Sequence, residues 1–461
     1  MTAFPDVSRS LQTYERAGQL IPGWTQLISR RADQFANGVN PVYAQRAKGS
    51  RFVDIDENEW IDWVNAVGAI ILGHADDVVN AAVKAQIDQG SIYTLSSPLE
   101  IELAEELVQT IPSAEMVRYT KGGGEACAVA VRIARGVTGR DKVLICGYHG
   151  WHDWYQAANF GVDPESGEYP FAGIEPIGVP RALAGTVIPF KYGDLQALAD
   201  LLDEHAGEVA AIQMEPARSE LPPEGYLQGV QAIAKQHGVI LIFDEVSCGW
   251  RYRIGGIQEA VGVTPDMTVV AKAMSNGYPM GAVVGSREVM EPAARMFISS
   301  SYWSDNIGLA AALTTIRELK RRGAEERFRA MGEQLRSALN QAMAAAGLAG
   351  ACVGLYSNPS VSFTLPTNTL PSDTDPAEAV RQENVLRRKL NTLFIQEMAR
   401  HGVHTLTTFM ATLAHTQTDI EYTAEAAYEA FRVVQRGLEL GNLDALLVCD
   451  LKKDPFRRLV R

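Results

Sequence analysis

A lysine at the end of a short apolar run is the residue of this chain whose surroundings best suit chemistry. Lys272 follows Val269, Val270 and Ala271 and precedes a turn rich in glycine and proline and a second apolar run, residues 282–285. Partial burial there would lower the pKa of the ammonium and free a neutral amine, which can form a Schiff base with a carbonyl compound. A lysine that only extends from a strand end towards water is the alternative on this stretch alone.

Two adjacent acids end another apolar run. Asp244 and Glu245 follow residues 239–243, which form a predicted strand. A buried carboxylate needs a partner, because a buried charge without one is costly. A protonated pyridine nitrogen is one such partner, and a helix cap or a metal ion is an alternative. Asp244 and Lys272 each follow a predicted strand, so both can face one crevice.

A glycine-rich turn lies between a predicted strand and a predicted helix. It reads Lys121, Gly122, Gly123, Gly124 and Glu125. Backbone without side chains can approach a ligand closely, and the free N–H groups and positive end of the following helix favour an anion such as phosphate. The turn lacks the Gly-Lys-Ser/Thr of a P-loop and the G-x-G-x-x-G spacing of dinucleotide-binding folds.

Aromatic and imidazole rings are concentrated in residues 147–154, directly after the next predicted strand. One of these rings could stack on a planar cofactor. An aromatic patch of the core is the alternative interpretation of the same residues.

The elements that position these residues alternate between strand and helix from about residue 114 to 290. Strands are predicted at 117–119, 142–146, 209–214 and 239–243, with helices at 125–135, 195–205 and 227–237. Continuous apolar strands between helices indicate a mostly parallel sheet covered on both faces. Ligands bind such sheets at the carboxyl ends of the strands, where each stretch described above is located.

The flanking regions predict a further domain. A β-hairpin is predicted over 51–63, helices over 77–90, 99–110 and 306–347, and a loop over 366–380. We expect an N-terminal arm and hairpin at 1–75 that joins the small domain, a large domain at 76–335, and a C-terminal small domain at 336–461.

Composition limits the partners and the compartment. A net charge of −13 argues against nucleic acid and anionic membranes, since both require a basic surface. The five cysteines are scattered, which indicates reduced thiols in a cytoplasmic protein and neither a disulfide framework nor a metal site. Neither a signal peptide nor an apolar run long enough to span a bilayer is evident.

The motifs together resemble the class III (subgroup II) aminotransferases of the fold-type I enzymes that use pyridoxal 5'-phosphate (PLP). They are most similar to the glutamate-1-semialdehyde aminomutase branch. The matching motifs, in family order over residues ~50–420, are Gly-Gly-Glu-Ala at 123–126, Tyr-His-Gly at 148–150, Met-Glu-Pro at 214–216, Phe-Asp-Glu-Val at 243–246, the Lys272 stretch and residues 300–305. The resemblance implies an α/β fold: a large domain with a mostly parallel seven-stranded sheet flanked by helices, and a smaller α+β domain from both ends of the chain.

The resemblance also implies PLP as the cofactor and roles for single residues. Lys272 would hold PLP as a Schiff base and move a proton between substrate and cofactor, while Asp244 would hold the pyridinium. Tyr148 and Val246 would cover the two faces of the ring. The remaining cofactor contacts would be Glu215, the N–H groups of Gly123 and Gly124, and Ser301, which would reach the phosphate in the partner subunit of a homodimer with shared active sites.

The phosphate loop departs from the family pattern. The family usually carries serine or threonine where this chain has Gly122 and Gly124. The lost hydroxyl contacts would have to be replaced by water, Lys121 or Ser301.

The substrate positions depart as well. The aminomutase arginine that binds the substrate carboxylate is replaced by Tyr43, and an expected glutamate by Met410. We therefore predict substrate contacts from Tyr43, Trp151 and Arg218, with Trp154 as a further aromatic wall. An ion pair of Arg218 with Glu220 or Glu224 is the alternative.

These observations predict a PLP-dependent class III aminotransferase. An amino donor, an amino acid such as glutamate, would pass its amine through PLP held by Lys272 to a ketone or aldehyde acceptor. The aromatic pocket favours a specialised acceptor, sugar-like or from secondary metabolism. Two alternatives are an intramolecular aminomutase similar to the glutamate-1-semialdehyde enzymes and a catalytically weak PLP-fold protein that acts by binding.

Overall fold

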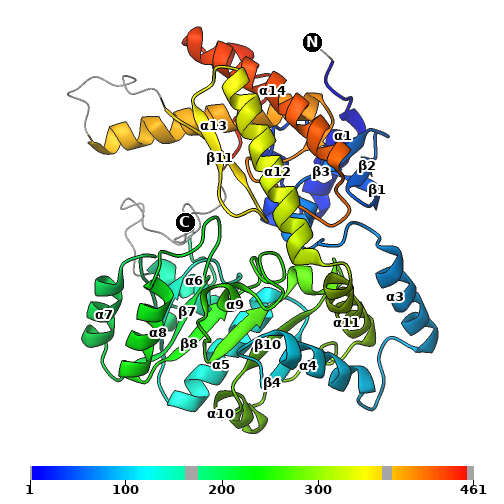
Figure 1. Ribbon diagram of the computed structural model, residues 1–461. Helices are drawn as coiled ribbons and strands as arrows, with labels where there is room; N and C mark the ends of the chain where they lie inside the picture. Colours follow the sequence, from blue (N-terminus) through cyan, green and yellow to red (C-terminus); the bar gives the residue numbers. More distant parts are fainter. Residues whose placement is uncertain (1–2, 161–174, 366–375, 454–461) are drawn as a thin grey trace. The chain divides into compact units, whose positions relative to one another are not determined.

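A computed structural model describes residues 3–160, 175–365 and 376–453 of the chain. Contacts divide these residues into two compact units (Figure 1). The first unit comprises the described parts of Met1–Val67, Gly73–Ala75 and Arg327–Pro455, and the second comprises Gly68–Leu72 and the described parts of Asp76–Glu326. The domain boundaries predicted from the sequence, after residues 75 and 335, stay a prediction.

A seven-stranded sheet is the centre of the second unit. Its strand order is β4 (Met116–Thr120), β10 (Gly281–Gly285), β9 (Met267–Val270), β8 (Ile240–Asp244), β7 (Val209–Met214), β5 (Lys142–Cys146) and β6 (Val187–Pro189). Five of these strands, β9, β8, β7, β5 and β6, pair in parallel, and β10 is antiparallel to both of its neighbours. The predicted mostly parallel seven-stranded sheet is confirmed.

Both faces of this sheet are buried. Val143 and Ile145 of β5 pack in one apolar cluster with α5 (Gly123–Thr138). Leu144 and Cys146 point to the opposite face, where they pack with α7 (Leu195–Glu204) and α8 (Tyr226–His237), which lie together in Figure 1. Helices on both faces explain why the strands are continuous apolar runs.

Side chains cap the N-termini of three further helices. The Ser97 hydroxyl and the Glu100 carboxylate form a capping box at α4 (Pro98–Thr110), and Asp76 caps α3 (Asp77–Gln89). Asp305 caps α11 (Asn306–Arg321), which α12 (Ala324–Ala345) follows. These helices confirm the elements predicted at 77–90, 99–110 and 306–347. Shorter helices are α6 (Asp153–Gln156), α9 (Ile257–Val261) and α10 (Arg287–Met290).

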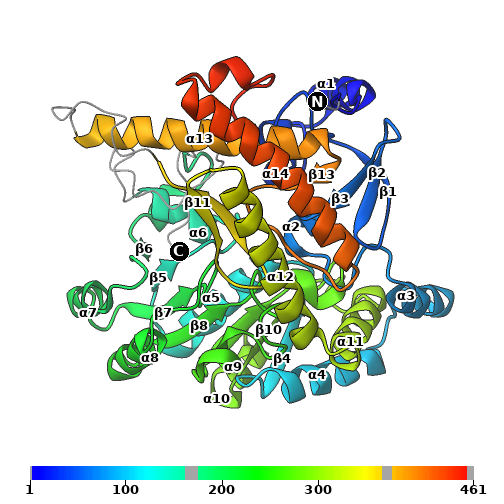
Figure 2. The ribbon, with the colours of Figure 1, turned by 45° about the horizontal axis from the view of Figure 1, so that its top comes forward.

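The first unit contains two small sheets. One has the order β1 (Ala44–Lys48), β2 (Arg51–Asp54), β3 (Glu59–Asp62) and β13 (Val403–His404), and the other pairs β11 (Gly350–Val353) with β12 (Ser360–Phe363). The β2–β3 pair confirms the predicted hairpin. The helices of this unit include α1 (Ser8–Leu20), α13 (Pro376–Arg400) and α14 (Gln417–Glu439), and Figure 2 shows α13 and α14 crossing.

The prediction of a loop over residues 366–380 is partly wrong. Residues 366–375 lie outside the described residues, but residues 376–380 form the first turns of α13. A proline suits the first turn of a helix, because its missing N–H would have no intrahelical partner there. Pro376 is therefore a helix start and not part of a loop.

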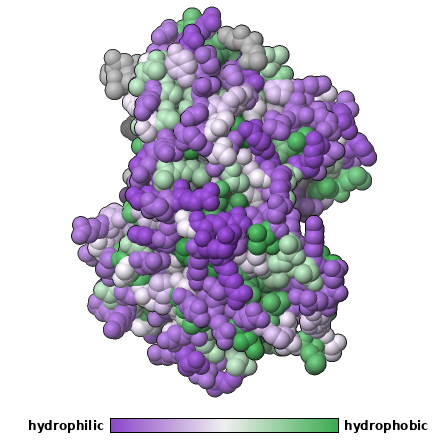
Figure 3. Space-filling view, turned by 45° about the vertical axis from the view of Figure 1, so that its right-hand side comes forward, coloured by the Kyte–Doolittle hydropathy of each residue, from purple (hydrophilic) through white to green (hydrophobic). Residues whose placement is uncertain are grey.

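Hydrophilic and hydrophobic side chains are mixed on the face drawn in Figure 3. Within the part of the chain that the structure describes, no helix combines the length and the apolar content needed to cross a membrane.

Candidate active site

Lys272 begins the short helical turn that follows β9. Its φ is 49°, a left-handed conformation that is uncommon for residues other than glycine and is often associated with functional sites. Its Nζ donates a hydrogen bond to Oγ of Ser247 at 2.8 Å. Burial lowers the pKa of Lys272, Arg218 lowers it further, and Glu215 and Asp244 oppose the shift. A lowered pKa increases the fraction of neutral, nucleophilic amine near neutral pH.

Asp244 ends β8, the strand next to β9. The two strands are parallel, so Asp244 and Lys272 lie at the same edge of the sheet. The Asp244 carboxylate is buried, and its Oδ2 lies 2.7 Å from Nδ1 of His149 and accepts a hydrogen bond from the Cys127 thiol at 3.3 Å. Its Oδ1 accepts from the N–H of Val246 at 3.0 Å. These contacts fix the orientation of the carboxylate.

The structure distinguishes the roles of the two adjacent acids, Asp244 and Glu245, for which a helix cap and a metal ligand were the alternatives. Glu245 is a helix cap: its buried carboxylate accepts hydrogen bonds from the N–H groups of Ile257 and Gln258 at the start of α9, and burial raises its pKa. Asp244 instead belongs to a cluster with Cys127 and His149, whose metal-ligating atoms lie within 4.8 Å of one another. The hydrogen bonds that Asp244 makes to Cys127 and His149 account for this proximity.

The start of α5 is shaped by its glycines. A Cβ on Gly123 would lie 2.7 Å from Cγ1 of Val246, so a side chain there would collide with Val246. Among the described residues, none would lie within 4 Å of a Cβ on Gly122, and no side chain caps the helix. The first N–H groups of α5 therefore stay available to a ligand. Lys121 is held elsewhere, since its Nζ pairs with Asp305 at 2.9 Å.

Tyr148 and Arg218 meet at Glu215, which follows β7. The N–H of Tyr148 donates to Oε2 of Glu215 at 3.2 Å, and burial, reinforced by nearby Cys127, Asp244 and Glu215, raises the pKa of the Tyr148 phenol. Nη1 of Arg218 pairs with Oε1 of Glu215 at 2.8 Å. An ion pair of Arg218 was the alternative to a substrate contact, and the structure shows such a pair with Glu215, whose buried carboxylate requires a cation.

The predicted aromatic and hydroxyl contacts are distributed unevenly. Trp151 is 68% exposed and stacks on His152, with 4.6 Å between the ring centroids. Trp154 is buried in the apolar cluster of α5, so it is a core residue and not a pocket wall. Ser301 is exposed and lies in a turn. Tyr43 belongs to the first unit, where its N–H donates a hydrogen bond to Oγ of Ser10.

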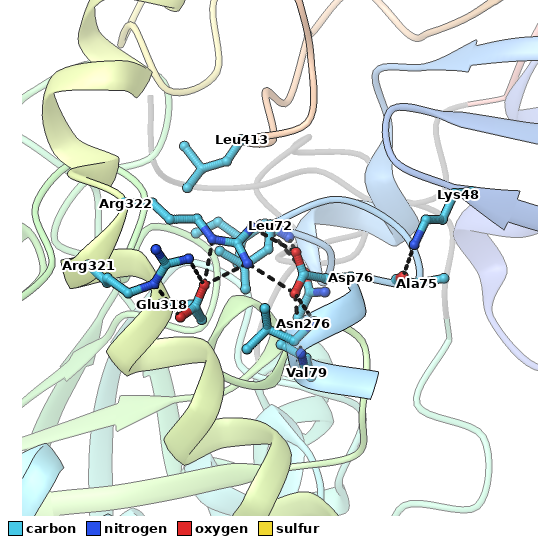
Figure 4. A network of polar contacts seen from close by, with 12 residues as sticks. Lys48, Leu72, Ala75, Asp76, Val79, Asn276, Glu318, Arg321, Arg322 and Leu413 are labelled. Atoms are coloured by element: carbon cyan, nitrogen blue, oxygen red, sulfur yellow. Dashed lines mark hydrogen bonds and ion pairs between the residues drawn. The ribbon is translucent and has the colours of Figure 1, made fainter. Parts of the chain in front are cut away.

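A polar network supports the segment that carries Lys272 (Figure 4). Oδ1 of Asn276, at the end of the Lys272 turn, accepts hydrogen bonds from the N–H groups of Ile71 and Leu72, both at 2.9 Å. Beside it, Arg322 bridges Asp76 at 2.7 Å and Glu318 at 2.6 Å. Glu318 also binds Arg321, whose hydrogen bonds are the main reason that the pKa of Glu318 falls to about 2. The network ties the start of α3 to the end of α11, and α11 packs on the Lys272 turn.

Several residues of the site were not singled out from the sequence. Ser247, Cys127 and His149 contact Lys272 or Asp244 but have no individual signal, because their neighbours along the chain do not indicate which turn they face. His149 and His152 were only part of an aromatic stretch. Nε2 of His149 and Nδ1 of His152 are buried and have no hydrogen-bond partner among the described residues.

The chemistry of these groups fits PLP. The amine of Lys272 suits an aldehyde, the buried carboxylate of Asp244 suits a pyridinium, and the uncapped start of α5 suits a phosphate. The open space at Gly122 and the orphaned Nδ1 of His152 lie at that same helix start.

Comparison with known proteins agrees with this chemistry. The family model for class III aminotransferases matches residues 34–349. A 3-aminobutyryl-CoA aminotransferase of Cloacimonas acidaminovorans is 32% identical over 442 residues, which cover 94% of this chain and 99% of the relative. A glutamate-1-semialdehyde 2,1-aminomutase of Desulforamulus reducens is 33% identical over 447 residues, with 94% and 99% covered.

Solved structures agree as well. The PLP-bound FumI protein of Sphingopyxis sp. MTA144 superposes with a TM-score of 0.82 at 25% identity, covering 96% of this chain and 99% of that protein. The family match spans more than half of the chain, and the relatives match it almost end to end. The chain therefore belongs to the class III aminotransferases, PLP-dependent enzymes of fold type I.

Proposed function

We propose that this enzyme moves an amino group from an amino donor, an amino acid such as glutamate, to a ketone or aldehyde acceptor. The observation that carries the proposal is the position of Lys272 and Asp244 at the carboxyl ends of two adjacent strands. When bound, PLP supplies an aldehyde that reacts with amines and a ring that withdraws electrons from the substrate.

The chain's own residues would bind PLP and move the proton. Nζ of Lys272 would hold the aldehyde carbon of PLP, and as a free amine it would take a proton from one carbon and return it to another. Asp244, oriented by His149 and Cys127, would keep a proton on the pyridine nitrogen. The other proposed cofactor contacts are Tyr148 and Val246 on the ring faces, Glu215 beside Tyr148, and the N–H groups of Gly123 and Gly124 on the phosphate.

Substrate recognition is proposed for Arg218, Trp151 and Tyr43. Arg218 is held by Glu215 but remains partly exposed, so a substrate carboxylate would compete with Glu215 for the guanidinium. Trp151 offers an exposed aromatic face. We expect an acceptor larger than a simple keto acid, and equally fast turnover of all simple keto acids would contradict that expectation.

We also propose a cytoplasmic homodimer with shared active sites. The large exposed apolar side chains of Phe297 and Tyr302, which are close to Ser301 along the chain, support a partner surface there. None of the five cysteines, all in described segments, forms a disulfide, which suits a reducing compartment. A mixed dimer of Lys272→Ala and Ser301→Ala chains tests the sharing. One intact site per mixed dimer is expected if Ser301 serves the partner, and none if it serves its own chain.

The first experiment is an absorbance spectrum of the purified protein with PLP, before and after excess glutamate. We expect a yellow band with PLP that glutamate converts to the pyridoxamine phosphate spectrum, followed by a screen of ketones and aldehydes for return of the band. A Lys272→Ala control should form no Schiff base with PLP that borohydride can reduce to a stable covalent link. No band in the parent would favour the alternative of a catalytically weak PLP-fold protein that acts by binding.

An intramolecular aminomutase is the second candidate. The similarity to glutamate-1-semialdehyde 2,1-aminomutases supports it. An aminomutase would convert a single substrate without a second keto acid, so product formation from glutamate 1-semialdehyde alone would favour it over the transaminase.

A further inference from the structure

The imidazole ring of His152 occupies the space that a side chain on Gly124 would take. A Cβ on Gly124 would lie 3.3 Å from both Nδ1 and Cε1 of His152. Contact at that distance is tighter than usual, so a side chain at 124 would require the imidazole ring to move by a few tenths of an ångström. Gly124 is the second residue of α5, at the helix start where the N–H groups are free.

Two contacts in the turn after β5 place the ring beside Gly124. Gly150 packs directly on Gly124: a Cβ on Gly150 would come within 2.6 Å of the Gly124 Cα. Trp151 stacks on the outer face of the imidazole with an interplanar angle of 22°. The turn after β5 is thereby pressed against the start of α5, with His152 between Trp151 and Gly124.

The nitrogen that faces Gly124 has no partner. Nδ1 of His152 is buried and makes no hydrogen bond to any described residue. A buried polar atom without a partner is costly, and such an atom beside an open helix start points to a ligand. The other nearby groups are engaged: Lys121 pairs with Asp305, and Glu125 accepts a hydrogen bond from the N–H of Lys121 at 2.8 Å.

We propose that His152 is a side-chain ligand of the PLP phosphate and replaces the hydroxyl groups that Gly122 and Gly124 lack. This inference rests on the proposed binding of the phosphate by Gly123 and Gly124. The neutral ring, protonated at Nδ1, donates one hydrogen bond to a phosphate oxygen, in addition to those from the helix N–H groups. Trp151 then has a positioning role, since it holds the imidazole plane.

The test compares PLP with pyridoxal, which lacks the phosphate, on the apoenzyme by absorbance titration. His152→Ala is expected to weaken the binding of PLP roughly 10- to 100-fold, as for loss of a hydrogen bond to a charged group. The affinity for pyridoxal should not change. His152→Asn, whose amide nitrogen can replace Nδ1, is expected to retain most of the PLP affinity. His237→Ala, on α8, is the matched control and should change neither affinity.

A second variant pair keeps the test decisive. Gly124→Thr alone should lower the affinity for PLP, because the new side chain meets the His152 ring. Gly124→Thr in the His152→Ala background should recover affinity, because the threonine restores a hydroxyl. The ³¹P NMR shift of bound PLP should change in His152→Ala and not in His237→Ala.

Equal weakening of PLP and pyridoxal, or no weakening of PLP, would overturn the assignment of His152. A parent protein that binds neither compound would instead overturn the proposed function, so the two failures are distinguishable.

Discussion

Nζ of Lys272 donates a hydrogen bond to Oγ of Ser247 at 2.8 Å, across the ends of β9 and β8. The hydroxyl accepts from the ammonium and so stabilises the charged form of the lysine, whereas burial disfavours that form and lowers the pKa. Ser247 therefore moderates the reactivity of Lys272 before a cofactor is bound.

Ser247→Ala should make the free lysine more reactive. Without the acceptor the pKa of Lys272 falls further, and the neutral fraction near pH 7 rises. We expect PLP capture by the apoenzyme to accelerate roughly tenfold at pH 7, as for loss of one hydrogen bond to a charged group, with a pH midpoint shifted to lower pH. Stopped-flow absorbance across pH measures both. Ser286→Ala, outside the site, is the control, and a shift of the midpoint to higher pH would contradict the interpretation.

Lys272→Met should stabilise the apoenzyme at neutral pH. The pKa of Lys272 is lower in the folded than in the unfolded state, so between the folded pKa and about 10.4 the unfolded state binds more protons. The parent's free energy of unfolding therefore rises with pH through that window, and below it the penalty is fully present.

The variant has no such group, so its free energy of unfolding should exceed that of the parent by ~1 kcal/mol or more at pH 7. This difference should disappear towards pH 10. Urea unfolding of both apoenzymes at pH 7 and 10 checks this. A variant less stable than the parent at pH 7 would show that packing by the lysine stem outweighs the buried charge.

Asp244→Asn should retain the fold and lose chemistry. The amide oxygen can still accept from Val246, but the negative charge at the end of β8 is gone. We expect the half-reaction with glutamate to slow by roughly 10²- to 10³-fold, the scale for removing one preorganised electrostatic contact. Glu245→Gln is a matched control on the adjacent acid. It should lower stability through the α9 cap and leave the half-reaction within a factor of about three.

Gly123→Ala should destabilise the enzyme by overpacking. The new Cβ would lie 2.7 Å from Cγ1 of Val246, a conflict that typically costs about 1–3 kcal/mol. The double variant Gly123→Ala/Val246→Ala should recover most of the loss, and Gly122→Ala, whose Cβ meets nothing, should stay close to the parent. Denaturant unfolding reports all three, and an additive double variant would argue against the Val246 contact.

Asn276→Ala should loosen the segment that carries Lys272. The N–H groups of the buried residues Ile71 and Leu72 lose their acceptor, at a cost of about 1–3 kcal/mol. The φ of 48° adds to this, because alanine tolerates the left-handed region less well than asparagine. Asn276→Asp retains the acceptor oxygen and is the control in denaturant unfolding. Equal stability of the two variants would mean that these hydrogen bonds contribute little.

Local rules explain why much of the fold could be predicted from the sequence. The alternation of Val143 and Ile145 with Leu144 and Cys146 needs two apolar faces, and the structure supplies α5 on one and α7 with α8 on the other. Ser97 with Pro98 indicated a helix start from neighbouring residues alone. Pro376 was misjudged because a proline after a polar stretch suits a loop and a helix start equally well.

The sequence by itself determined the kinds of elements, the mostly parallel sheet and the positions of Lys272 and Asp244 at strand ends, because these depend on residues close together along the chain. It also determined the family, because the motifs occur along the chain in the family order. Only the tertiary structure decided that Ser247 faces Lys272, that Glu215 pairs with Arg218, and that the ring of His152 lies against Gly124. These contacts depend on the turns that follow strands β5, β7, β8 and β9. Side-chain direction in such turns is set by the three-dimensional order of the strands, which no local pattern encodes.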